Sequence, residues 1–348
     1  MIEHLKSSYS FSLPEDQIAH EPVADRVSCR LLSLSRESGE LEHHHFYDLV
    51  ELLPSDSILV LNDTKVIHAR ILIKRKSGAK GEVLIQNKCS DGTFTAIARP
   101  SKRLRENEEL ICIKNEDYFI QMNSYHGDGL WNVSIKPEIN YPEAMSDIGA
   151  LPLPPYIKRE QGTHDSDESN YQTVFSKNRG SVAAPTASLH FTKELLEKIK
   201  AKGIQIITLT HHVGMGTFYP IRVENIKEHQ MHTENYSIPK NTCEVISKAK
   251  KEGRKVIAVG TTVMRALEST AQKVLNGEEI NEATNLFIYP PYQFSVVDGL
   301  VTNFHLSESS LLMLVSAFAD RERILNAYQI AIAEKYRFFS FGDAMFIS

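Results

Sequence analysis

The sequence predicts a discontinuous α/β domain with a mostly parallel or mixed sheet, interrupted by a small antiparallel six-stranded β-barrel. Short segments rich in Ile, Val, Phe and Tyr follow one another from about residue 69 to residue 135 without a helical pattern between them, as in a barrel or sandwich. On either side, strand and helix patterns alternate, as in an α/β layer. A chain of 348 residues is also too long for one ordinary core. We therefore expect an α/β domain over residues 1–68 and 151–348, and an inserted barrel over residues 69–150.

The first elements are expected to be a helix over residues 46–53 and a strand over residues 57–63. The run His43-His44-His45 is expected to form a solvated face of this first helix. In the barrel, turn-forming groups such as Ser90-Asp91-Gly92 separate the strands, and Trp131, the only tryptophan, is expected in the core. The barrel strands are expected at residues 69–75, 81–87, 93–100, 109–114, 118–124 and 130–135.

Three later helices have recognisable starts. Thr192 can cap a helix that ends at Gly203, Asn241 starts a second, and Thr261 or Thr262 opens a third. Helices from about residue 308 to residue 336 follow near the end of the chain. The strands between these helices are expected at residues 204–213, 255–260, 286–290 and 294–302.

Composition excludes several classes of protein. No stretch of about 18 apolar residues could span a membrane, and the first residues lack the apolar core of a signal peptide. The four cysteines are scattered, so we expect packing residues in a reducing cytosol rather than a disulfide framework or a zinc ribbon.

Charge is unevenly distributed along the chain. The net charge of −5 argues against a nucleic-acid partner, but Lys65 to Arg105 contains 11 Lys and Arg against two acidic residues, a local charge of +9. Such a block suits a phosphate backbone. Strand edges that carry Lys and Arg against aggregation produce the same composition, so both interpretations stay open.

Two segments before residue 240 carry groups suited to binding or catalysis. Residues 180–192 combine small side chains with hydroxyls and lead to a helix start, which suits a ribose, a carboxylate or a phosphate, or else a tight turn beneath the sheet.

His211 and His212 end a predicted strand, where at most one of them can point into a given cleft. Gly214 and Gly216 follow, but no third glycine completes a dinucleotide motif, and Pro220 blocks a helix. His229 and His232 alone do not predict a metal site.

Two later segments have the same character. Gly260, Thr261 and Thr262 form a strand-to-helix turn followed by Arg265, an arrangement that could hold an anion. Asp298 and His305 lie among apolar neighbours. A buried aspartate needs a partner such as Arg or His.

Together and in this order, these segments resemble one family. The blocks LVLNDTKVI, LPLPPYIKR, SVAAPTA, THHVG, VGTT, RALES, VVDGLVTNFHL and YRFFSFGDAMFI closely resemble the S-adenosylmethionine:tRNA ribosyltransferase-isomerases of queuosine biosynthesis, from about Pro14 to Ile347. The resemblance implies an α/β domain interrupted by a small barrel. It also implies transfer and isomerisation of the ribosyl moiety of S-adenosylmethionine onto 7-aminomethyl-7-deazaguanine at the tRNA wobble position. The products would be epoxyqueuosine-tRNA, adenine and methionine.

The resemblance also implies partners and residue roles. We expect a cytoplasmic monomer with tRNA and S-adenosylmethionine as substrates, without a metal, a tightly bound cofactor or a membrane. The expected catalytic residues are His211, His212, Glu234, Asp298 and His305. The residues expected to bind S-adenosylmethionine are Ser181, Pro185, Thr186, Gly260, Thr261, Thr262 and Arg265. Those expected to bind tRNA are Arg99, Lys102, Arg103 and Arg105. The rival hypotheses are an S-adenosylmethionine methyltransferase, which the missing glycine-rich loop disfavours, and a non-catalytic tRNA-binding module.

Overall fold

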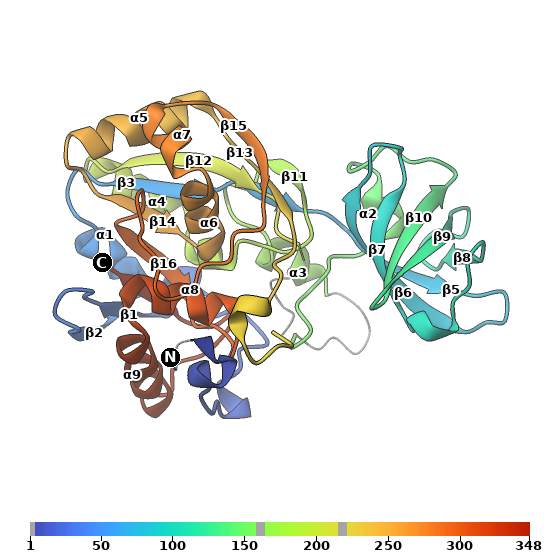
Figure 1. The fold of residues 1–348 in the computed structure, drawn as a ribbon, viewed down its shortest axis with the longest axis horizontal. Coiled ribbons are helices and arrows are strands. Elements are labelled where there is room, and N and C mark those ends of the chain that lie inside the picture. The colour runs from blue at the N-terminus through green and yellow to red at the C-terminus, as the bar shows by residue number, and fades with distance from the viewer. Residues whose placement is uncertain (1–3, 158–163, 215–220) are drawn as a thin grey trace.

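The structure is a computed structural model that describes residues 4–157, 164–214 and 221–348. An α/β lobe contains both ends of the chain, and a small barrel stands beside it (Figure 1). The lobe is built on a nine-stranded mixed sheet in the order β15-β13-β12-β3-β14-β16-β17-β1-β2. In chain order these strands are β1 (Arg30–Leu34), β2 (Leu41–His45), β3 (Ile58–Asn62), β12 (Gln205–His211), β13 (Glu234–Ile238), β14 (Val256–Val259), β15 (Ile280–Thr284), β16 (Gly299–Asn303) and β17 (Ala344–Ile347).

The expected barrel is confirmed. Six antiparallel strands close in the order β10-β7-β6-β5-β8-β9. Their inward side chains form a separate apolar core, to which the short helix α2 (Met145–Ile148) adds two residues. Trp131 is 3% exposed and donates from Nε1 to Ser101 Oγ over 2.9 Å, so it belongs to the core as expected. The strands are β5 (Arg70–Lys74), β6 (Lys80–Lys88), β7 (Phe94–Arg99), β8 (Glu109–Cys112), β9 (Phe119–Gly127) and β10 (Leu130–Lys136).

Four neighbouring strands at the centre of the large sheet run parallel: β12, β3, β14 and β16. Their carboxyl ends therefore meet at one edge of the sheet, the usual ligand edge of an open α/β fold. A two-stranded sheet lies beside this edge, formed by β4 (Thr64–Val66) and β11 (Asn178–Ser181).

The central strands bury both faces, which is why they read as continuous apolar runs. Alternate residues of β3 point to opposite sides. Ile58 and Val60 join the core beneath α5 (Lys240–Lys251), α6 (Thr261–Ser269), α8 (Ser310–Ala319) and α9 (Arg321–Ala333). Leu59 and Leu61 join the core beneath α4 (Lys193–Ala201). Burying each such side chain contributes roughly 1.5–3 kcal/mol, so the sheet is the rigid support of the lobe.

The helices begin largely where the capping residues predicted. Thr192 Oγ1 accepts a hydrogen bond from Leu195 N over 3.2 Å at the start of α4. Asn241 is not the cap of the next helix, because the carbonyl of Pro239 already accepts from the first amides of α5. Within the described residues, no helix has both the length and the apolar character needed to cross a membrane. The helices of the lobe are α1 (Leu49–Leu52), α3 (Asp165–Asn170), α4 (Lys193–Ala201), α5 (Lys240–Lys251), α6 (Thr261–Ser269), α7 (Ala271–Asn276), α8 (Ser310–Ala319) and α9 (Arg321–Ala333).

Three further local predictions are wrong. The histidines at residues 43–45 lie on β2, which pairs antiparallel with β1, and not on a helix. The strand expected at residues 286–290 does not form. The strand of this region is β15, which begins six residues earlier, at Ile280, and pairs with β13 at the edge of the sheet. Pro290 and Pro291 have no N–H to donate to a strand ladder, whereas the polar residues of β15 suit an edge strand. Strand β16 begins only at Gly299 rather than at residue 294.

Candidate active site

The carboxyl edge of the parallel strands is held together by Asn62, the last residue of β3. Its Oδ1 accepts from His211 N over 2.9 Å and from Thr64 N over 3.2 Å, and its Nδ2 donates to His211 O over 2.9 Å. Asn62 is fully buried, so it fixes where β12 ends relative to β3. Sequence reasoning missed this residue, although a polar Asn-Asp pair directly after an apolar strand was the available signal.

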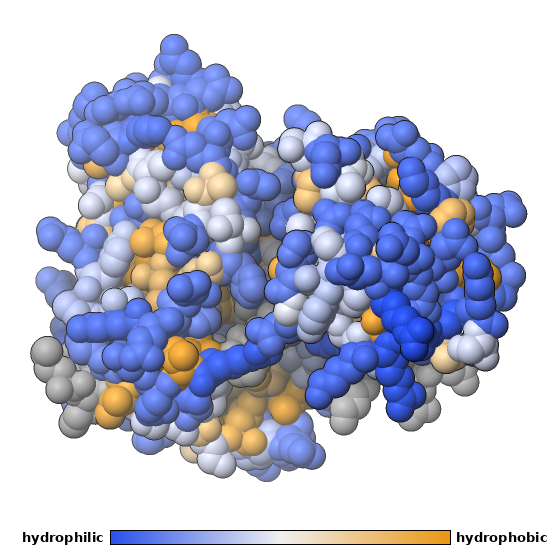
Figure 2. Space-filling view, turned by 45° about the vertical axis from the view of Figure 1, so that its right-hand side comes forward, coloured by the Kyte–Doolittle hydropathy of each residue, from blue (hydrophilic) through white to orange (hydrophobic). Residues whose placement is uncertain are grey.

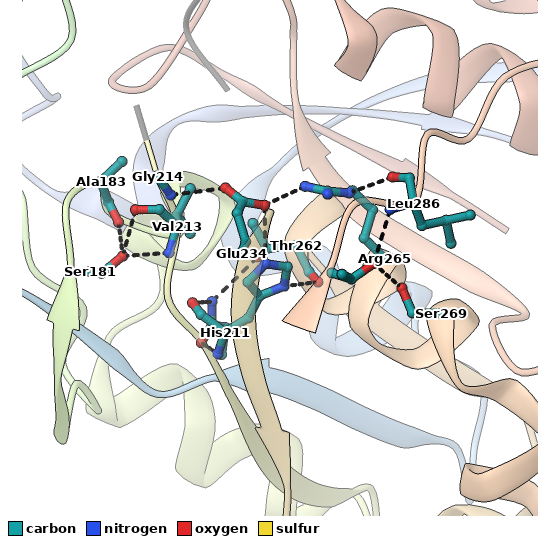
Figure 3. A network of polar contacts seen from close by, with 12 residues as sticks. Ser181, Ala183, His211, Val213, Gly214, Glu234, Thr262, Arg265, Ser269 and Leu286 are labelled. Atoms are coloured by element: carbon teal, nitrogen blue, oxygen red, sulfur yellow. Dashed lines mark hydrogen bonds and ion pairs between the residues drawn. The ribbon is translucent and has the colours of Figure 1, made fainter. Parts of the chain in front are cut away.

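A buried ionic network lies at the same edge (Figure 3). Glu234, the first residue of β13, accepts through Oε2 from Arg265 Nη1 on α6 and lies 3.1 Å from His211 Nε2. Its Oε1 accepts from Gly214 N over 2.8 Å. The other ring nitrogen of His211, Nδ1, lies 2.9 Å from the carbonyl oxygen of Thr262. Three segments distant in sequence, the end of β12, the start of β13 and α6, thus meet at one carboxylate.

The carboxylate at the centre of this network is ionised. Burial raises the pKa of Glu234, but the Arg265 charge and the His211 contact outweigh it and lower the pKa to about 2. Glu234 is therefore ionised and only accepts hydrogen bonds, as does the Thr262 carbonyl. Both ring nitrogens of His211 therefore face hydrogen-bond acceptors.

His212 is the histidine of the pair that faces open space. Its Nδ1 lies 2.8 Å from Thr64 Oγ1, and its ring lies so close to Gly180 that a Cβ there would approach Nε2 to 2.8 Å. Burial, and then the charge on His211, lower the pKa of His212. The imidazole is therefore neutral at neutral pH. The expectation that at most one of the two histidines points into a cleft is met, because His211 is fully buried.

A cleft of about 960 Å³ opens between the α/β lobe and the barrel. Figure 2 shows the corresponding hollow between the two lobes. His212, Gly214 and Glu234 line it from the sheet edge, and Arg99 and Lys102 line it from the barrel. Its volume lies at the upper end of the range usual for small-molecule sites.

The loops expected to bind S-adenosylmethionine are mostly buried in the lobe. Ser181 is fully buried, and its Oγ accepts from Val213 N over 2.8 Å. Residues 185–190 form a cap and a short 3₁₀ helix. Gly260, Thr261 and Thr262 start α6, and Arg265 directs its charge at Glu234. Among the described residues, the lining of the cleft includes none of these expected ligand-binding residues.

Two expected catalytic residues lie apart from this network. Asp298 precedes β16, at the amino edge of the parallel strands. It accepts from Lys250 Nζ through both carboxylate oxygens at 2.9 Å and from Val256 N at 2.9 Å. Its partner is thus a lysine rather than the expected Arg or His. His305 follows β16, and its Nε2 lies 2.8 Å from Thr302 Oγ1. Burial lowers the pKa of His305 to about 3.

The barrel as a whole is much less positively charged than the segment from Lys65 to Arg105. Residues 69–150 contain twelve Lys and Arg but also eleven Asp and Glu, a net charge of +1. Folding pairs the cations of β5 and the following turn with acidic residues that lie beyond the counted segment or on β6. These pairs are Arg70–Glu82, Lys74–Glu116, Arg75–Glu108 and Lys76–Glu109.

The cations expected to bind tRNA stay largely outside these pairs. Lys102, Arg103 and Arg105 are exposed, and no carboxylate among the described residues pairs with them. Arg99 is 57% exposed and lies 3.9 Å from Glu82. Lys102 and Arg99 line the cleft, whereas the other two do not.

Metal ligands do not converge in the part of the chain that the structure describes: no group of three or more His, Cys, Asp or Glu side chains could hold an ion. His229 and His232 line the cleft. Gly216 and Pro220 lie outside the described residues.

A buried contact between Cys29 and His190 superficially resembles a nucleophile and its base. Cys29 Sγ lies 3.2 Å from His190 Nδ1, and His190 Nε2 lies 3.0 Å from Asn303 Nδ2. Burial raises the pKa of the thiol and lowers the pKa of His190 to about 3, so both groups are neutral. A buried neutral thiol is inert, as expected of a packing residue.

Comparison with known proteins identifies the family of the chain. The family model described as "Queuosine biosynthesis protein" matches residues 6–347. The chain belongs to this family. Among solved structures, it is similar to the S-adenosylmethionine tRNA ribosyltransferase of Thermotoga maritima. The two sequences are 34% identical, the match covers 98% of this chain and 100% of that one, and the TM-score is 0.55. The queuosine biosynthesis fold is therefore shared along nearly the whole chain.

Proposed function

We propose that this member of the queuosine biosynthesis family is an S-adenosylmethionine-dependent tRNA ribosyltransferase-isomerase. It transfers and isomerises the ribosyl moiety of S-adenosylmethionine onto 7-aminomethyl-7-deazaguanine at the tRNA wobble position. The products are epoxyqueuosine-tRNA, adenine and methionine. The observation that carries the proposal is a neutral histidine, His212, beside a buried ionic network at the wall of a cleft. The barrel, which we propose as an inserted domain over residues 69–150, forms the other wall.

The reaction needs a base. A sulfonium acidifies the protons on the adjacent ribose carbon, and removing one of them begins the rearrangement. His212 suits this role because its lowered pKa keeps the imidazole neutral, and no hydrogen-bond partner of Nε2 is found among the described residues. Thr64 holds the ring through Nδ1 at 2.8 Å. A positioned base of this kind contributes typically 10²–10⁴-fold in rate.

Of the His211–Glu234–Arg265 network, Glu234 lines the cleft, whereas His211 and Arg265 do not. His211 is fully buried and both of its nitrogens are engaged, so it is a positioning residue rather than a proton donor to substrate. Glu234 holds the amide of Gly214 at 2.8 Å and thereby shapes the cleft wall. Burial, and then the charge on His211, disfavour protonation of His212.

RNA occupies the barrel side of the cleft. Arg99 and Lys102 line this wall, and exposed guanidinium and ammonium groups suit phosphates. Arg103 and Arg105 extend the cationic strip beyond the cleft. The donor and the RNA base thus meet between two walls of different chemistry.

The deciding assay measures free adenine after incubation of the protein with S-adenosylmethionine and tRNA that carries 7-aminomethyl-7-deazaguanine. Adenine release is expected. A methylated product would instead support a methyltransferase, and RNA binding without adenine release would support a binding module.

A variant pair tests the role of His212. His212→Asn is expected to slow adenine release roughly 10²–10⁴-fold. His43→Asn is the matched control, because His43 also contacts a hydroxyl, that of Tyr336 at 2.7 Å, but on exposed strand β2. The rate of the wild type should fall only below about pH 6.5, because the pKa of His212 is lowered from 6.5 and the base must be deprotonated. Equal rates for the two variants would exclude His212 as the base.

A further inference from the structure

An exposed tyrosine occupies the barrel wall of the cleft. Five large hydrophobic side chains among the described residues are strongly exposed, and Tyr125 on β9 is the member of this set that lines the cleft. Tyr125 is 48% exposed. Beside a candidate reaction site, an exposed aromatic ring offers a ligand a large apolar face and a polar hydroxyl.

The ring is held in place from below. Its centroid lies 4.9 Å from that of Trp131, at an interplanar angle of 44°, and Trp131 is anchored in the barrel core through Ser101. The main-chain amide of Tyr125 donates to Glu106 Oε1 over 3.3 Å. The tyrosine is therefore supported by the core on the side of Trp131, while 48% of its surface stays exposed.

The surroundings of the ring match the chemistry of single-stranded RNA. Arg99 and Lys102 line the same wall and suit phosphates, and the amides of Gln86 and Asn87 can read base edges. Proteins that bind unpaired nucleotides combine a cationic track with aromatic rings on which bases stack. A membrane or an apolar peptide would not require this mixture of cations and amides.

We infer that Tyr125 is a stacking platform for an unpaired nucleobase of the RNA substrate. The inference rests on the proposed function for the identity of the RNA, a tRNA anticodon loop. It adds a binding residue beyond the cationic strip and gives the barrel a role in holding a base, in addition to the phosphates. Stacking tolerates any base, because every base has an aromatic face.

The test is the affinity of the full-length protein for an anticodon stem-loop RNA without the modified base, measured by fluorescence anisotropy. Tyr125→Ala is expected to weaken binding about ten-fold, while Tyr125→Phe retains the wild-type affinity, because the ring rather than the hydroxyl makes the contact. Tyr47→Ala is the matched control, since Tyr47 is also 48% exposed but lies outside the cleft. Equal affinities for Tyr125→Ala and Tyr47→Ala would overturn the inference.

Salt dependence separates stacking from charge. Tyr125→Ala should leave the slope of log affinity against log salt unchanged, because a stacked base releases no counterion, whereas Lys102→Ala should make that slope shallower. A shallower slope for Tyr125→Ala would mean that the ring only positions the cations, and would also refute stacking.

Failure of the proposed function would give a different result. If the wild type released no adenine yet Tyr125→Ala lost affinity for the RNA, the reaction would be wrong and the stacking site would stand. If adenine were released and Tyr125→Ala bound normally, the reaction would stand and the stacking site would fall.

Discussion

Replacing Glu234 by glutamine is expected to destabilise the α/β lobe by about 3 kcal/mol at neutral pH. The folded protein lowers the pKa of this carboxyl from 4.5 to about 2, and a lowering of about 2.5 pH units corresponds to about 3 kcal/mol. A second argument gives a similar magnitude. The substitution leaves Arg265, 3% exposed, without its carboxylate, and removing one partner of a buried pair costs about 3–5 kcal/mol.

Urea denaturation measures this free energy of unfolding. Far-ultraviolet circular dichroism follows the helices, which belong mainly to the α/β lobe, whereas emission from Trp131 follows the barrel core. The Glu234→Gln variant should lower the midpoint of the first signal more than that of the second. Adding Arg265→Met should recover part of the loss, because the unpaired charge is then removed. A loss below about 1 kcal/mol, the value for an exposed pair, would refute the reasoning.

The pH dependence provides an independent check. Since folding lowers the pKa of Glu234, its contribution to stability is fully present above pH 4.5 and is lost as the pH falls towards about 2. The difference in free energy of unfolding between the wild type and Glu234→Gln should therefore shrink across this interval. A difference that stays constant down to the acid limit would show that the carboxylate is not stabilised by its neighbours.

Three further predictions concern the cleft and its supports. Gly180→Ala should reduce adenine release, because the new Cβ would approach His212 Nε2 to 2.8 Å. It should also lower the free energy of unfolding by about 1–3 kcal/mol, because φ of Gly180 is +150°. Wild-type activity of this variant would contradict the prediction. Neutralising the unpaired barrel cations should weaken RNA binding and flatten its salt dependence without changing affinity for S-adenosylmethionine, as measured by titration of Lys102, Arg103 and Arg105 variants. Asp298→Asn should lower the free energy of unfolding by about 1–3 kcal/mol, because the contact with Lys250 is weakened. The rate of adenine release should not change. A large loss of rate in a folded variant would mean that Asp298 is a catalytic residue.

Local patterns were sufficient to predict the architecture. The six barrel strands, the Thr192 cap and the start of α6 at Thr261 each depend on neighbours within a few residues. The same holds for the parallel strands, whose continuous apolar runs reflect burial on both faces. Strand β15, whose position was not predicted, has no such run, because an exposed edge needs few apolar side chains.

The sequence by itself determined the fold class, the family and the segments that end at the carboxyl edge of the sheet. Only the tertiary structure decided which polar groups meet there. It brought Glu234, His211 and Arg265 together and placed Asp298 at the opposite edge with Lys250. It also paired four cations of the basic block with acidic residues. The physical reason is that hydrophobic periodicity depends on residues that are close in the sequence. The energy of a charged side chain depends instead on partners that folding brings within a few ångströms of it.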